Sequence, residues 1–183
     1  MNTMHQTEGP WLSEPELRAW MRFVAVVELL PGVLDAQLQR DAGVSHFEYY
    51  VLAMLSESPE RTLRMTALSD LTNATLPRLS HVIKRLEARR FVVRTPCEQD
   101  RRATNATLTA EGWGVVASAA PGHVRNVRAN VVDVLSHEQV AQLDAISDQL
   151  LRRLDPDNRM NAKATALGQS MSRAPGRSMN GGT

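Results

Sequence analysis

The residues of this 183-residue chain best suited to chemistry are the cations between positions 75 and 102. That stretch holds eight Lys or Arg against three Asp or Glu, a net charge of +5, although the whole chain has a formal net charge of +1. The net charge is −5 over residues 1–74, −2 over 103–156 and +3 over 157–183. Clustered cations neutralise phosphates, and an acidic remainder disfavours non-specific contact, so this distribution indicates a nucleic-acid partner.

A charged triplet, Asp100, Arg101 and Arg102, lies between two short runs of strand-forming residues, 91–93 and 106–108. The two runs predict a β-hairpin. The long polar segment between them predicts a connecting loop that is longer than a tight two-residue turn. One carboxylate can hold an arginine fork in a fixed direction while the neighbouring guanidinium meets phosphates or a narrow minor groove. A solvated charged loop is the alternative interpretation.

The segment before this hairpin predicts a DNA-reading helix. Leu79, Val82, Ile83 and Leu86 recur at i, i+3, i+4 and i+7, the spacing of one buried helix stripe, so the opposite face is polar and cationic. A helix followed by a basic hairpin is the order of a winged helix-turn-helix, which reads the major groove with the helix and the neighbouring backbone or minor groove with the wing. We expect DNA contacts from Thr75, Pro77, Arg78, Ser80, His81, Lys84 and Arg85 in the helix and from Arg94, Asp100, Arg101 and Arg102 in the wing.

Capping residues predict where the helices begin. A Ser or Thr that accepts a first-turn N–H, with Glu or Gln three residues later, forms a capping box. Boxes occur at Ser13 with Glu16, Ser45 with Glu48 and Ser136 with Gln139, and single caps at Thr109 and at Thr75 or Asn73. Pro31 with Gly32, and Pro121 with Gly122, predict kinks or short breaks in two long helices.

Three motifs in order resemble the MarR (multiple antibiotic resistance regulator) family of bacterial transcription factors. They are MTALSDL at 65–71, the helix within 73–90, and a wing with Arg94, Asp100 and Arg102 that closes on LTAEG at 108–112. The resemblance covers roughly residues 13–154 and is most characteristic in D-x-R followed by L-T-x-x-G. It implies a mainly α fold with a small β-wing, a winged helix-turn-helix flanked by N- and C-terminal dimerisation helices.

Arg90 departs from this family's usual pattern, which has Gly after the recognition helix. A glycine at that point suits a left-handed C-terminal cap. We therefore expect that Arg90 either accepts modest strain or ends the helix in a different way.

The resemblance also implies a homodimer, in which the apolar faces of residues 13–30 and 124–154 pack against a second copy. A two-fold dimer places two recognition helices about 34 to 36 Å apart and predicts a palindromic operator. Arg102 resembles the arginine that this family inserts into the minor groove, Asp100 resembles the carboxylate that aims it, and repression is the family's usual mode. The alternative is that these apolar faces complete the core of a monomer.

The domain organisation expected from these patterns is a single MarR-like domain with polar ends. It comprises a flexible N-terminus at 1–12, the domain at 13–156 and a disordered tail at 157–183, with a winged helix-turn-helix at 45–108 and dimerisation helices at 13–44 and 109–156.

A small aromatic effector is implied by the resemblance, because family members often bind such compounds between the dimer helices and the winged unit. The residues that offer rings and hydrogen-bonding groups in that region are Trp20, Phe23, His46, Tyr49 and Tyr50. The alternative to a ligand contact, for each of these residues, is an ordinary packing role in the core or at the dimer interface.

Two other functions compete with operator binding. One is a winged-helix protein-interaction module that has lost DNA binding, against which the cationic stretch argues. The other is redox sensing through Cys97, the single cysteine, which lies in the wing beside Glu98. An adjacent carboxylate disfavours the reactive thiolate, although Arg101 and Arg102 offset this effect.

Catalytic, metal and membrane functions find no support in the sequence. The chain has no G-x-S-x-G motif, no phosphate-binding glycine loop and no metal-like spacing among its histidines, so we expect neither an enzyme nor a cofactor or metal. No apolar run approaches the roughly 18 residues that span a bilayer, and the first 20 residues lack a secretory pattern. We therefore expect a cytoplasmic protein without a membrane partner.

Overall fold

The computed structural model describes residues 11–97 and 100–160, without the side chains of Arg101 and Arg102. Most of the predicted flexible N-terminus and tail, residues 1–10 and 161–183, lies outside the described residues. The helices are α1 (Glu14–Ala42), α2 (His46–Ser56), α3 (Met65–Leu71), α4 (Leu76–Ala88), α5 (Ala110–Val127) and α6 (His137–Leu154). The strands are β1 (Thr62–Arg64), β2 (Val92–Cys97) and β3 (Asp100–Leu108).

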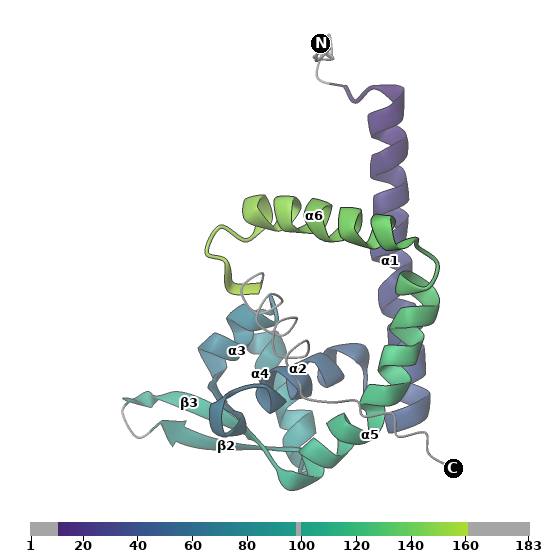
Figure 1. Ribbon diagram of the computed structural model, residues 1–183. Helices are drawn as coiled ribbons and strands as arrows, with labels where there is room; N and C mark the ends of the chain where they lie inside the picture. The colour runs from purple at the N-terminus through teal and green to yellow at the C-terminus, as the bar shows by residue number, and fades with distance from the viewer. Residues whose placement is uncertain (1–10, 98–99, 161–183) are drawn as a thin grey trace, which may run out of the picture.

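The helices and strands form a winged unit attached to a frame of long helices (Figure 1). Helices α2, α3 and α4 pack with the sheet, and α5 runs beside the second half of α1. The first half of α1 projects away from the winged unit, and α6 turns back from the end of α5 across the molecule. The predicted fold class, mainly α with a small β-wing, is confirmed.

The sheet is antiparallel with strand order β1-β3-β2, and β1 was not anticipated because three residues carry no periodicity. The predicted long hairpin tip is wrong, since β2 extends to Cys97 and β3 starts at Asp100, which leaves only residues 98–99 between them. Pro96 is therefore a strand residue, paired with Thr104 next to a register shift. Proline is tolerated at such an irregularity because a ladder hydrogen bond is already missing there.

The core of the winged unit is built on the predicted stripe of α4. Leu79, Ile83 and Leu86 are fully buried and Val82 is 5% exposed. They belong to one cluster with buried leucines of α2 and α3 and with β2 and β3. Each such side chain contributes about 1.5 to 3 kcal/mol on burial, so the stripe fixes how α4 is rotated about its axis.

The corner where α4 ends is formed by Arg90, which adopts the left-handed conformation with φ of 60°. The N–H of Arg90 donates to the Glu87 carbonyl at 2.8 Å and the N–H of Phe91 to the Leu86 carbonyl at 2.9 Å, the Schellman pattern. The Thr109 hydroxyl donates to the Arg90 carbonyl at 2.7 Å. Of the two outcomes expected for Arg90, the strained cap is the one observed, and Thr109 fastens it to the start of α5.

The predicted capping boxes are present, and neither long helix breaks at its proline, so of the predicted kinks or breaks the breaks are wrong and the kinks stay predictions. The carboxylate of Glu48 accepts the N–H of Ser45 at 2.9 Å, and the Gln139 side chain does the same for Ser136. Helix α1 continues through Pro31, and α5 continues through Pro121. A proline removes one N–H donor yet keeps a helical φ, and the packing of α1 against α5 offsets this loss. The irregularity lies later, in the π-helical turn Arg128–Val132.

Two glycines of α5 make a matched test of the corner between the wing and this helix. A Cβ at Gly112 would lie 2.1 Å from the Phe91 carbonyl oxygen, whereas a Cβ at Gly114 meets nothing within 4 Å. We expect Gly112→Ala to lower the free energy of unfolding in urea by about 1 to 3 kcal/mol or more. Gly114→Ala, the control, should raise it by up to about 1 kcal/mol. Equal effects of the two substitutions would contradict this packing.

Candidate nucleic-acid interface

The face of α4 opposite the buried stripe is open to solvent. Thr75 is the N-cap, its hydroxyl faces the Arg78 N–H at 3.4 Å, and Pro77 lies in the first turn, where its missing N–H costs nothing. The helix residues predicted to face DNA all lie on this open side, with Ser80 half-buried and the others exposed: Thr75, Pro77, Arg78, His81, Lys84 and Arg85. The helix dipole at this N-terminus favours anions as well.

Arg78 is held in place by an aromatic ring. Its guanidinium carbon lies 4.4 Å from the ring centroid of Phe47, a residue of α2. Among the described residues, no carboxylate forms an ion pair with Arg78 or Lys84. A guanidinium stacked by its face keeps its N–H edge available, which suits bidentate recognition of a base or phosphate.

Arg85 and Arg94 differ from Arg78 because each has a carboxylate partner. Arg85 lies 3.1 Å from Glu48, the same carboxylate that caps α2 and that is only 9% exposed. Arg94 lies 2.6 Å from Glu87, and this carboxylate also accepts the backbone N–H of Arg94 at 3.1 Å. These pairs connect α4 to α2 and to the wing, so both arginines have a positioning role beside the predicted DNA contact. The partners Glu48 and Glu87 were missed as site residues, since neither stands at a helical spacing from its arginine.

The wing carries the remaining predicted contacts. Arg101 and Arg102 lie on β3, but their side chains are outside the described residues, so the predicted contact between Asp100 and Arg102 stays a prediction. A hollow separates the wing from the exposed side of α4. Its lining consists of Arg64, Met65, Thr66, Leu76, Ser80, Arg94, Ala103 and Thr104.

The five predicted ligand residues do not form one site within the chain. Trp20 and Phe23 lie on the projecting half of α1, with ring centroids 6.4 Å apart and about half of each side chain exposed (Figure 1). The Tyr50 hydroxyl donates to the Leu71 carbonyl at 3.2 Å, toward α3. His46 and Tyr49 lie together in a second cluster, away from that ring pair.

The third member of that cluster is His123 of α5, which the sequence did not single out. Its ring centroid lies 4.8 Å from Tyr49 and 6.2 Å from His46. Burial lowers the pKa of His46, partly opposed by the Asp35 carboxylate, and burial together with His46 lowers the pKa of His123. Burial raises the pKa of Tyr49 and Tyr50. All four groups are therefore neutral at pH 7, and His123 Nδ1 is buried without a hydrogen-bond partner among the described residues.

Cys97 lies at the end of β2 with 5% of its surface exposed. An oxidant reaches a buried thiol only after local opening of the wing, so this environment does not favour redox sensing.

The comparisons with known proteins agree with this geometry. Residues 42–103 match the model of the MarR family. Sco3205, a MarR family transcriptional regulator from Streptomyces coelicolor solved in complex with DNA, is 43% identical with a TM-score of 0.76, over 79% of this chain and 94% of that chain. This chain belongs to the MarR family of transcriptional regulators.

Other MarR-type proteins show the same relationship. AbsC, a MarR family regulator from Streptomyces coelicolor, is 35% identical with a TM-score of 0.77, over 81% of this chain and 99% of that chain. The HTH-type transcriptional regulator PrsX of Escherichia coli is 26% identical over 113 residues, which are 62% of this chain and 68% of PrsX. As a MarR regulator the protein is a DNA-binding winged helix-turn-helix. Within the part of the chain that is described, no helix is long and apolar enough to span a membrane.

The two half-buried imidazoles predict a pH-dependent stability. Because burial holds the folded-state pKa of His46 and His123 below the ordinary 6.5, the unfolded chain binds more protons once the pH falls below that value. The free energy of unfolding in urea should therefore be retained well above pH 6.5, the ordinary histidine value, and decrease as the pH falls below it. The decrease should shrink in His123→Gln but not in His137→Gln, an exposed control on α6. Identical pH profiles for the wild type and His123→Gln would contradict the assignment.

Proposed function

We propose that this MarR-family protein is a homodimeric repressor of a palindromic operator. The exposed face of α4 enters the major groove and the wing contacts the adjacent minor groove or backbone. The observation that carries the proposal is the open, cationic side of α4, held outward by the buried stripe on its other side. The relation to Sco3205, solved with DNA, supports it. Operator binding places the protein in the cytoplasm.

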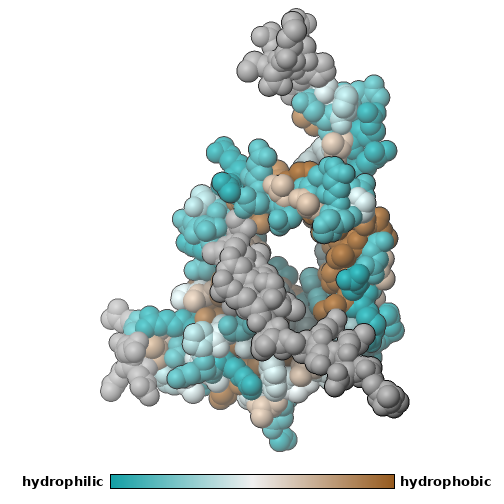
Figure 2. Space-filling view, viewed as in Figure 1, coloured by the Kyte–Doolittle hydropathy of each residue, from teal (hydrophilic) through white to brown (hydrophobic). Residues whose placement is uncertain are grey.

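A second copy of the chain is the partner that best fits the exposed apolar faces. No described residue of α6 is buried, and its apolar stripe is exposed at Leu143, Ile146, Leu150 and Leu154. Figure 2 shows hydrophobic surface along the α1 and α5 side of an opening that α6 borders. An apolar groove lies between α1, the turn before α6 and α6 itself, lined by Val26, Leu29, Leu30, Val33, Asn130, Val131, Val134, Leu135 and Leu143. Exposed apolar surface of this extent is typical of an interface. In a two-fold dimer, the same patch of each copy is buried against the other copy.

A small aromatic effector fits the cluster of His46, Tyr49 and His123, where α1, α2 and α5 meet. The cluster offers aromatic surface together with the unpartnered Nδ1 of His123. A compound bound there touches both the frame helices and the winged unit, so it releases DNA if it prefers a different angle between them.

Selection of bound fragments from random duplex DNA is the experiment that tests this function. We expect enrichment of an inverted repeat with half-site centres about 10 to 10.5 base pairs apart. Recovery of no sequence preference, or of isolated half-sites only, would contradict a dimeric operator-binding function.

Arg78 should determine base preference. We expect Arg78→Ala to reduce discrimination between the selected operator and single-base variants by about 1 to 3 kcal/mol at one position, as for a bidentate contact. Arg78→Lys is the matched control, because lysine keeps the positive charge but lacks the forked guanidinium. Relative to Arg78→Ala, it should recover more of the operator affinity than of the discrimination between bases. An equal loss of affinity for every duplex would instead assign Arg78 to the backbone.

Arg102 should contribute affinity through the wing. We expect Arg102→Ala to weaken operator binding. The slope of log K against log salt should become shallower by about 1, the value for one lost phosphate contact, while the thermal midpoint of unfolding stays the same. Fluorescence anisotropy across a salt series measures both quantities. Unchanged affinity of the folded variant at physiological salt would remove Arg102 from the interface.

A further inference from the structure

The segment that follows α6 contacts the helix-turn-helix, although the sequence assigned its last residues to a disordered tail. Asp155 closes α6, with its N–H donating to the Leu151 carbonyl at 2.7 Å. Its carboxylate then accepts the backbone N–H groups of Arg159 at 3.0 Å and Met160 at 2.8 Å. The chain therefore turns back in a bonded loop instead of continuing away from the fold.

Arg159 connects this loop to α3, the first helix of the helix-turn-helix. Its guanidinium lies 3.0 Å from the Asp70 carboxylate and 2.8 Å from the Asp157 carboxylate. Around this link the loop and the end of α6 face a hollow of about 500 Å³ that reaches Asn73 and Thr75. The residue that caps the recognition helix thus lines the same hollow as Arg159.

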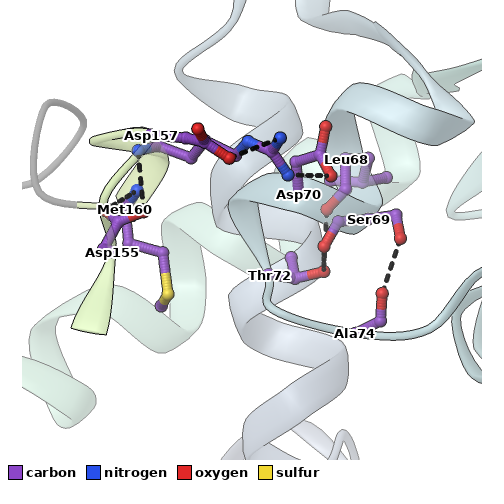
Figure 3. Close-up of polar contacts among 9 residues, drawn as sticks. Leu68, Ser69, Asp70, Thr72, Ala74, Asp155, Asp157 and Met160 are labelled. Atoms are coloured by element: carbon purple, nitrogen blue, oxygen red, sulfur yellow. Dashed lines mark hydrogen bonds and ion pairs between the residues drawn. The ribbon is translucent and has the colours of Figure 1, made fainter.

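Side-chain hydrogen bonds connect the turn between Asp70 and Thr75 to α3. The Ser69 hydroxyl donates to the Ala74 carbonyl at 2.5 Å, and the Thr72 hydroxyl donates to the Leu68 carbonyl at 2.7 Å. Figure 3 shows these bonds beside the loop that carries Asp155 and Asp157. These bonds connect the end of α3, which carries Asp70, to the turn that leads into α4.

Within its own chain, helix α6 is anchored mainly at its ends. None of its described residues is fully buried, and it is connected to the turn after α5 at one end and to the bonded 155–160 loop at the other. We infer that Arg159 is a positioning residue for DNA reading, whose ion pair with Asp70 fixes the recognition helix relative to α6 and thereby sets the half-site spacing that the dimer accepts. This inference rests on the proposed dimeric operator binding.

The test measures affinity for duplexes in which two selected half-sites are placed at separations from about 8 to 13 base pairs, around the one-turn spacing. The wild type should prefer one separation. Arg159→Gln and Asp70→Asn should flatten this preference by about two- to fivefold for each subunit, as much as an exposed ion pair supplies. The matched control is Arg152→Gln, which removes an ion pair of 2.8 Å to Asp148 within α6 and should leave the preference unchanged.

Charge reversal distinguishes positioning from a general structural effect. The double variant Asp70→Arg with Arg159→Asp should restore the spacing preference that each single reversal reduces, at an unchanged thermal midpoint. If the wild type prefers one separation sharply and Arg159→Gln keeps that preference, the inference is overturned and the proposed function still stands. A wild type that binds none of the duplexes would overturn the proposed function itself.

Discussion

Burial of the α4 stripe is the constraint on which the rest of the structure depends. Leu79, Val82, Ile83 and Leu86 together supply about 6 to 12 kcal/mol, whereas an exposed ion pair supplies about 0.2 to 1 kcal/mol. Rotating α4 to bury its cationic side would forfeit the larger quantity and desolvate charges as well. The polar face that we propose reads DNA is thus directed outward by apolar residues that lie buried on the opposite side of the helix.

Charged and polar contacts adjust the orientation that the stripe determines. Glu87 holds Arg94 at the start of the wing, and Glu48 holds Arg85 against α2. Just beyond the same end of α4, the left-handed Arg90 and the Thr109 hydroxyl fix the corner from which the wing and α5 leave. None of these contacts is large enough to fold the domain, but each selects a direction for an element that meets DNA or the frame.

Much of this architecture is predictable from the sequence because it depends on local patterns. The i, i+3, i+4, i+7 spacing gave the buried face of α4, and the Ser and Thr caps gave the starts of α2, α5 and α6. The helices do not break at Pro31 and Pro121, because packing between α1 and α5 outweighs one lost hydrogen bond. The carboxylate partners of Arg85, Arg94 and Arg159 were unpredictable, since they depend on which elements the fold brings together.

The claim that the exposed face of α4 reads the major groove in a two-fold dimer is tested most directly by dimethyl sulfate footprinting on a selected operator. The reagent reports guanine N7, an atom that only the major groove presents. The structure predicts two clusters of protected N7 atoms, related by the symmetry of the operator and about one helical turn apart. Tight binding with N7 atoms left reactive, or with a single unsymmetrical cluster, would contradict it.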